Sequence, residues 1–366
     1  MDQRSRAYVA SGAIVGIFLL VQLGALALVG PFEESGRQAV EDPQDPANSL
    51  IYVAVILVMT GVMLAIIRYN VDWLLRALLV GTGAYIGLFV FLELFPPVVT
   101  VPVDGVAVNV LPWLGAAALG LALWFHPEWY VIDAAGIVMG AGAAALFGIS
   151  FGVLPALVLL TVLAVYDAIS VYGTEHMLTL ASGVMELKVP VVLVVPLSLS
   201  YSYLDGGMPD PVGDDADENE ADVAEETESQ RAVETDGSDE RRAETDGRDG
   251  ETVWEDEAED LDIDREALFI GLGDAVIPTV LVASAAFFAP DSVPTVDLLG
   301  IPATLPALTA MVGTTAGLVV LLWMVLKGRA HAGLPLLNGG TIAGYLLGAL
   351  ASGLTLAQAT GIAPYI

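Results

Sequence analysis

Cysteine is absent from the 366 residues, and histidine occurs only at positions 126, 176 and 331. Without a thiol, the chain can form no disulfide, no thiolate metal site and no cysteine nucleophile. Three histidines in separate loops do not support a metal centre, so we expect neither a metal nor another cofactor. Charge is scarce too: 16% of the residues are charged, against about 25% in soluble proteins.

Long apolar runs dominate the sequence instead. Hydrophobic residues make up 55% of the chain, and several runs exceed the roughly 18 residues that a helix needs to cross a bilayer. We therefore predict an all-α polytopic membrane protein with nine transmembrane helices. The predicted spans are 7–29, 50–67, 73–94, 108–125, 129–147, 153–172, 267–289, 305–326 and 333–353.

Basic residues in the short connections orient these spans, because Lys and Arg gather on the cytoplasmic side. One side collects Arg4, Arg6, Arg68, Arg76, Lys327 and Arg329, whereas the other has only Arg37. In the cell membrane, the N-terminus is then cytoplasmic and the C-terminus extracellular. Run 7–29 has a signal peptide as its alternative, but its apolar core exceeds the usual 7–15 residues, so we predict a span.

The acidic residues divide the chain into three parts. Residues 1–172 form an N-terminal transmembrane region, 173–266 a cytoplasmic acidic loop, and 267–366 a C-terminal transmembrane region. Segment 209–260 has too few apolar residues to offset the entropy of ordering, so we predict disorder there. Before it, 174–188 has helical spacing and should extend the sixth span, while 189–197 reads as a strand or a re-entrant piece.

The net charge of −31 comes mostly from that loop. Such acidity argues against nucleic acid as a partner. Only two lysines accompany eleven arginines, a pattern that suits molar salt, in which charge repulsion is screened. A halophilic source is our hypothesis, and activity that survives dialysis into low salt would contradict it.

Glu93 and Asp133 lie near the ends of their predicted spans, where we expect solvated anchors. Two further carboxylates, Asp167 and Asp274, stand deeper inside predicted spans, where ionisable side chains are costly and usually functional. Asp167 lies about five residues from the cytoplasmic end of the sixth span, and Asp274 about seven residues from the start of the seventh. At about 1.5 Å per residue, both lie roughly 8–10 Å below the same surface. The alternative for each is a buried acid paired with a backbone or hydroxyl donor.

Two carboxyl groups at one depth can share a proton, because like charges about 3 Å apart cannot both stay ionised. The ionised partner acts as general base on a water molecule, and the protonated partner polarises a peptide carbonyl. This is the chemistry of an aspartic protease. We therefore predict that Asp167 and Asp274 form a catalytic dyad.

The neighbouring residues support such a site. Gly271 and Gly273 leave room for the close approach of an extended substrate. Pro278 cannot donate the helical hydrogen bond to the carbonyl of Asp274, so the seventh span should be distorted there. Tyr166 is expected to pack against the site or bond to it, although an ordinary tyrosine in a span is the alternative.

Tyr166-Asp167 in the sixth span, Gly271-Leu272-Gly273-Asp274 in the seventh, nine spans and a long loop between the aspartates resemble the presenilin/signal peptide peptidase family. Its members are intramembrane aspartyl proteases, and the likeness covers nearly the whole chain. An archaeal presenilin homologue fits the acidity and the small size. The resemblance implies single-pass transmembrane helices as protein substrates, with their N-termini outside.

The family also carries Pro-Ala-Leu at the start of its last span. Literal matches at 155–157 and 306–308 begin spans on the outer face, away from the aspartates. The resemblance therefore assigns the substrate-binding motif to Pro335-Leu336-Leu337, with Leu in place of Ala. A helix start broken by proline exposes backbone groups that can hold a substrate as an added strand.

Two rival functions remain. An ion-coupled transporter also uses intramembrane acids and broken spans, but no inverted repeat relates the two aspartate segments. A non-catalytic scaffold that recruits partners through the acidic loop leaves the paired aspartates unexplained. The bilayer is the other expected partner, and the sequence leaves a homo-oligomer open.

Overall fold

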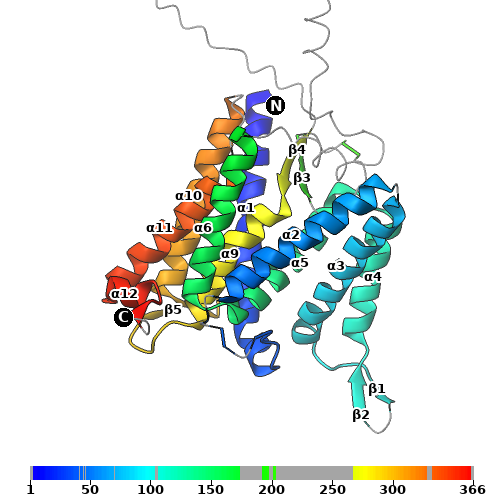
Figure 1. The fold of residues 1–366 in the computed structure, drawn as a ribbon. Coiled ribbons are helices and arrows are strands. Elements are labelled where there is room, and N and C mark those ends of the chain that lie inside the picture. The colour runs from blue at the N-terminus through cyan, green and yellow to red at the C-terminus, as the bar shows by residue number, and fades with distance from the viewer. Residues whose placement is uncertain are drawn as a thin grey trace, which may run out of the picture. The chain divides into compact units, whose positions relative to one another are not determined.

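The computed structural model is mostly helical (Figure 1). It describes residues 3–40, 42–43, 45, 47–69, 71–103, 106–173, 192–197, 201–202, 267–327 and 332–363. All of these belong to one compact unit, formed by Met1–Met208 and Ile263–Ile366. The predicted surface helix at 174–188 and the disordered segment at 209–260 lie outside the described residues.

Ten helices are present in the described part of the chain. They are α1 (Gln3–Glu34), α2 (Ala47–Arg68), α3 (Asp72–Leu94), α4 (Leu111–Phe125), α5 (Trp129–Ser150), α6 (Val153–Gly173), α9 (Leu272–Phe287), α10 (Leu305–Leu326), α11 (Gly333–Ala351) and α12 (Leu356–Ala359). Apolar segments become helices in a bilayer because only a helix satisfies every backbone donor and acceptor within the segment.

Each of the nine predicted spans overlaps one of these helices, but the count of nine spans is not confirmed. Among the described residues, six helices are long and apolar enough to cross a membrane. They are Ser5–Glu34, Trp73–Leu94, Trp129–Ser150, Val153–Ser170, Leu305–Leu326 and Gly333–Ala351. Three apolar helices are shorter: Leu50–Ile66, Leu111–Phe125 and Leu272–Phe287.

The expectation of an all-α fold needs a correction, because three two-stranded antiparallel sheets accompany the helices. The pairs are β1 (Thr100–Val103) with β2 (Val106–Asn109), β3 (Val192–Pro196) with β4 (Ala267–Gly271), and β5 (Thr295–Leu298) with β6 (Ile301–Thr304). Predicted spans 108–125 and 267–289 therefore begin as strands. Within 189–197, for which a strand or a re-entrant piece was expected, the described residues 192–196 form the strand β3.

The β3–β4 sheet joins segments that are far apart in the sequence. Val194 lies opposite Phe269, and Val192 lies opposite Gly271, the last residue of β4. Because β4 runs directly into α9, this sheet lies at the N-terminal end of α9. Both strands and the N-terminus of α1 lie near the top of Figure 1, whereas the β1–β2 hairpin, β5 and α12 lie near its bottom.

We call these two ends of the helix bundle the aspartate end and the hairpin end. The aspartate end has the starts of α1, α9 and α11 and the end of α6. The hairpin end has β1–β2, β5–β6 and α12. Pro306, in one of the two literal Pro-Ala-Leu triplets, stands in the first turn of α10, so that triplet begins its helix at the hairpin end.

Helix α1 passes through the middle of the bundle and contacts α5 and α9 (Figure 1). Its side chains Ile14, Phe18, Val21 and Ala25 are almost completely buried. Run 7–29, which we predict to be a span, thus contributes to the buried core.

Candidate active site

Asp167 lies on α6, six residues before the helix ends at Gly173. Its side chain is buried, with 7% of its surface exposed. The carboxylate oxygen Oδ2 accepts a hydrogen bond from the backbone N–H of Leu334, with an N–O distance of 3.1 Å. Leu334 is in the first turn of α11, where backbone N–H groups have no partner inside the helix. A backbone group of α11 therefore holds the Asp167 carboxyl group.

Asp274 lies in the first turn of α9, directly after the strand β4. Gly271 is the last strand residue and also the N-cap of the helix. The sequence placed Asp274 seven residues inside a helical span. The helical rise assumed for 267–271 is wrong, because these residues are extended and a strand rises about 3.3 Å per residue rather than 1.5 Å.

The two carboxyl groups meet at the start of α11. A Cβ atom placed on Gly333 would lie 3.5 Å from Oδ2 of Asp274, and the next residue, Leu334, donates to Asp167. The Asp167 and Asp274 side chains are close enough to interact electrostatically. Residues 107 positions apart in the sequence thus form one site, with the start of α11 as its third wall.

Leu272 and Gly273 of the Gly-Leu-Gly-Asp segment lie in different surroundings. Gly273 is exposed, and a Cβ atom there would approach only Ile277, at 3.9 Å. The Leu272 side chain points to α5 instead: a Cβ atom on Gly140 would lie 3.3 Å from its Cδ1 atom. Open space therefore adjoins Asp274 on the Gly273 side, and Leu272 packs the start of α9 against the bundle.

Pro278 is buried inside α9. The helix nevertheless continues from Leu272 to Phe287. The expected change of conformation beside Asp274 occurs earlier, at the junction of β4 and α9. Pro278 still leaves the carbonyl of Asp274 without its usual helical donor, since proline has no N–H group.

Tyr166 does not join the two aspartates. Its side chain is 54% exposed and lies on the outer surface of α6. Successive residues on a helix point about 100° apart, so the buried position of Asp167 turns Tyr166 towards the surroundings of the bundle.

The segment Pro335-Leu336-Leu337 continues the first turns of α11 from the residues that meet the aspartates. Pro335 and Leu336 are partly buried, while Leu337 is completely buried in a core cluster with Phe18 and Leu318. The predicted motif therefore lies beside the candidate site, and the Leu337 side chain anchors it to the bundle.

Two further residues of the site, and one carboxylate near it, were not recognised from the sequence. Gly333 contributes space and Leu334 contributes a backbone N–H group. Neither contribution can be recognised from the sequence, because neither requires a particular side chain. Asp133 on α5 was predicted to be a solvated anchor near a span end. Its side chain is only 8% exposed, and Oδ1 accepts a hydrogen bond from Val194 N in β3 at 2.8 Å.

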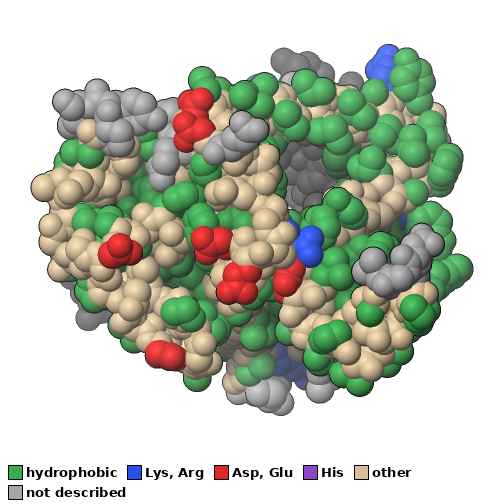
Figure 2. Space-filling model, turned by 90° about the horizontal axis from the view of Figure 1, so that it is seen from below, with side chains coloured by type: hydrophobic (Ala, Val, Ile, Leu, Met, Phe, Trp, Pro, Cys, Tyr) green, Lys and Arg blue, Asp and Glu red, His purple; other side chains and the backbone are tan. Residues whose placement is uncertain are grey.

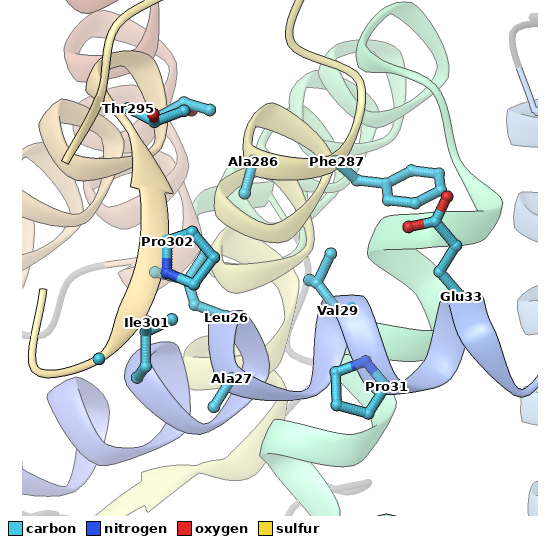
Figure 3. Close-up of a pocket in the computed structure, with 13 residues that line it drawn as sticks. Leu26, Ala27, Val29, Pro31, Glu33, Ala286, Phe287, Thr295, Ile301 and Pro302 are labelled. Carbon is cyan, nitrogen blue, oxygen red and sulfur yellow. The ribbon is translucent and has the colours of Figure 1, made fainter. Parts of the chain in front are cut away.

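A cavity of about 410 Å³ lies elsewhere in the molecule, between the C-terminal ends of α1 and α9 and the β5–β6 hairpin (Figure 3). Leu26, Val29, Phe287 and Pro302 contribute apolar walls, and Glu33 is its charged residue. These residues are at the hairpin end, about twelve helical residues, or roughly 18 Å, from Asp274 along α9. In the described part of the chain, no cluster of three His, Asp or Glu residues could hold a metal ion.

Known proteins resemble this chain at the levels of sequence and fold. A family model described as "Signal-peptide peptidase, presenilin aspartyl protease" matches residues 15–354. Two solved structures are described as those of a presenilin family intramembrane aspartate protease. The one in space group C222 has 31% identity and a TM-score of 0.56, covering 93% of this chain and 99% of that chain. The one in space group P2 has 31% identity and a TM-score of 0.55, with coverage of 93% and 97%. A search of curated proteins found no significant match.

Proposed function

The chain belongs to the presenilin and signal peptide peptidase family of aspartyl proteases, and from this premise we propose that Asp167 and Asp274 are its catalytic dyad. The protein is a hydrolase of the intramembrane aspartate protease class and a multi-pass membrane protein. The observation that carries the proposal is the meeting of both carboxyl groups at the start of α11.

In the proposed reaction, the two aspartates share one proton. The ionised carboxylate takes a proton from a water molecule, whose oxygen attacks the peptide carbonyl carbon, while the protonated carboxyl group donates a hydrogen bond to the carbonyl oxygen. Collapse of the tetrahedral intermediate breaks the C–N bond, and the leaving nitrogen takes up the proton that the first carboxylate accepted from water, which restores the dyad. The products are a new carboxyl terminus and a new amino terminus, and water is the only co-reactant.

The substrate is proposed to be a transmembrane helix that unwinds at the site, because peptide groups inside a helix are hydrogen-bonded internally. An extended segment needs backbone partners, and β4 has such groups. Val194 directs its N–H group away from β4 to Asp133. In an antiparallel pair, the opposite residue Phe269 then also directs its backbone groups outwards, and so does Gly271 two residues later.

No third strand pairs with the outer edge of β4 in the described part of the chain. We place the unwound substrate along this edge, which leads to Asp274. Pro335, Leu336 and Leu337 form the proposed opposite wall, with the buried Leu337 side chain fixing its position.

We further propose nine spans in a presenilin-like arrangement, with a cytoplasmic N-terminus and an extracellular C-terminus. Arg6, Arg68, Arg76 and Lys327 lie at helix ends on the aspartate side of the bundle. Arg37 follows the end of α1 at Glu34 and so lies at the hairpin end, where acidic side chains gather (Figure 2). The positive-inside rule then makes the aspartate end cytoplasmic. Substrate helices would be cut near their cytoplasmic ends, with their N-termini outside.

The test uses the purified protein in detergent with a fluorogenic transmembrane peptide. We expect Asp167→Asn and Asp274→Asn each to lower the cleavage rate by about 10²–10⁴-fold or more, the range over which acid–base groups act. Asp291→Asn, at an exposed aspartate at the hairpin end, is the matched control and should leave the rate unchanged. Cleavage that persists in both dyad variants would sink the proposal.

A further inference from the structure

Asp133 is another carboxylate at the aspartate end, and the proposed reaction does not use it. It lies in the second turn of α5, with 8% of its surface exposed. Its partner is the backbone N–H group of Val194, at 2.8 Å, in the middle of β3. A single side chain of α5 is thus bonded to a strand 61 residues away in the sequence.

The strand that Asp133 holds is connected to Asp274. Val194 lies opposite Phe269 in β4, and β4 ends at Gly271, three residues before Asp274. A sheet of two strands is marginally stable by itself and needs support from elsewhere. The Asp133 hydrogen bond gives this support at the edge of β3 that faces away from β4.

The same face of α5 also packs against both ends of this connection. A Cβ atom on Gly136 would lie 2.8 Å from Cδ2 of Leu193 in β3 and 3.6 Å from Cδ1 of Leu272 in α9. Gly140 is one turn further along α5 and also faces Leu272. Gly136 and Gly140 allow α5 to pack closely against β3 and against the first residue of α9. The hydrogen bond between Asp133 and Val194 then fixes β3 to α5.

We propose that Asp133 is a positioning residue for the reaction. Its hydrogen bond to Val194 fixes β3, and the paired strand β4 passes this position on to the start of α9 and to Asp274. The inference rests on the proposed role of Asp274 in catalysis. Because a misplacement of about 1 Å can lower a rate about 10²-fold, a buried anchor one strand away has a measurable effect.

Activity measurements separate the hydrogen bond from the charge. Asp133→Ala removes the acceptor and should lower kcat/KM about 10- to 100-fold. Asp133→Asn keeps a carbonyl oxygen for Val194 and should remain within about 3-fold of the parent, a difference ordinary for an intact site. The Asp291→Ala variant is the control for loss of a carboxylate elsewhere. An Asn variant as impaired as the Ala variant would overturn the proposal, because the carboxylate itself would then be required.

Cross-linking measures the position directly, and the absence of native cysteine makes it clean. Cysteines at 167 and 274 report the separation of α6 and the start of α9. Cysteines at 314 and 341 report the α10–α11 interface, where the two threonine Oγ1 atoms lie 2.7 Å apart. In the Asp133→Ala background, we expect slower cross-linking of the first pair and unchanged cross-linking of the second.

Two cross-linking results would contradict the inference. One is an unchanged 167–274 rate in the Ala variant, and the other is a loss of both cross-links, which would indicate general unfolding. Cross-linking does not depend on turnover. If the parent protein cleaves no transmembrane peptide, the proposed function fails. The effect of Asp133 on the position of Asp274 is then still measured by the cross-linking rates.

Discussion

At the scale of single residues, the site depends on backbone groups as much as on side chains. Asp167 and Asp274 supply the carboxyl groups, but Leu334 binds Asp167 through its N–H group, whatever its side chain. The free N–H groups of a helix N-terminus also carry partial positive charge. The start of α11 therefore gives two close carboxyl groups a favourable partner.

Leu334→Pro tests this contact, because proline removes the donor. Proline is tolerated in the first turn of a helix, where N–H groups lack internal partners. We expect the variant to lose about 10-fold or more in kcat/KM, within the usual effect of a lost hydrogen bond to a charged group. Leu334→Ala keeps the N–H group and should retain most of the activity. Equal activities of the two variants in the peptide assay would refute this role of the backbone donor.

At the scale of elements, the change from strand to helix at Gly271 positions Asp274. Both α9 and α10 begin directly after a paired strand. The N-cap of α10, Thr304, accepts a hydrogen bond from Ala307 N through its side chain, whereas the N-cap of α9, Gly271, has no side-chain cap. A short apolar run such as 267–271 fits a buried strand or a helix equally well. Pairing with β3 decides between them.

The interface of α10 and α11 supports the other side of the site. A Cβ atom on Gly340 would overlap the backbone carbonyl of Gly313, whereas one on the adjacent Gly339 would have no neighbour within 4 Å. The two helices are thus in contact through their backbones at Gly340. This contact keeps α11, and with it Leu334, at a fixed distance from α10.

Gly340→Ala is expected to destabilise the fold by about 1–3 kcal/mol, the typical cost of overpacking. Gly339→Ala is the matched control and should be neutral or stabilising by up to about 1 kcal/mol, since alanine favours helices over glycine. Thermal unfolding of the two variants in the same detergent measures the difference. Equal midpoints would mean that the helices separate readily at this point.

At the scale of the whole molecule, charge is distributed unequally between the two ends. Acidic side chains gather at the hairpin end (Figure 2). Arg37, which follows α1, pairs there with Glu93 near the end of α3, with an Nη2–Oε1 distance of 3.0 Å. Arg6, Arg68, Arg76 and Lys327 lie at helix ends on the aspartate side instead. This asymmetry is the physical basis of the proposed orientation.

Single cysteines test the orientation in whole cells, because no native cysteine competes. Ser35→Cys lies in the exposed turn after α1, and Tyr69→Cys replaces a side chain that is 76% exposed after α2. A maleimide that cannot cross membranes should label position 35 in intact cells and position 69 only after lysis. The reverse pattern would invert the proposed topology.

The amino-acid sequence by itself determined the class of the protein, the apolar segments that become helices and the two aspartates. These follow from composition and local order, because a bilayer excludes charge and forces apolar segments to satisfy their own backbone bonds. The family resemblance also rested on local motifs, and the comparisons confirmed it.

Tertiary structure alone decided how the site is assembled. The strand at 267–271 exists because β3 pairs with it, the contact with Leu334 is made by a backbone group, and Asp133 became buried because β3 lies against α5. Each of these depends on partners 61 to 167 residues away in the sequence. Local sequence patterns indicate the secondary structure and the environment that a residue prefers. The residues that it contacts far away in the sequence are decided only when the whole chain packs.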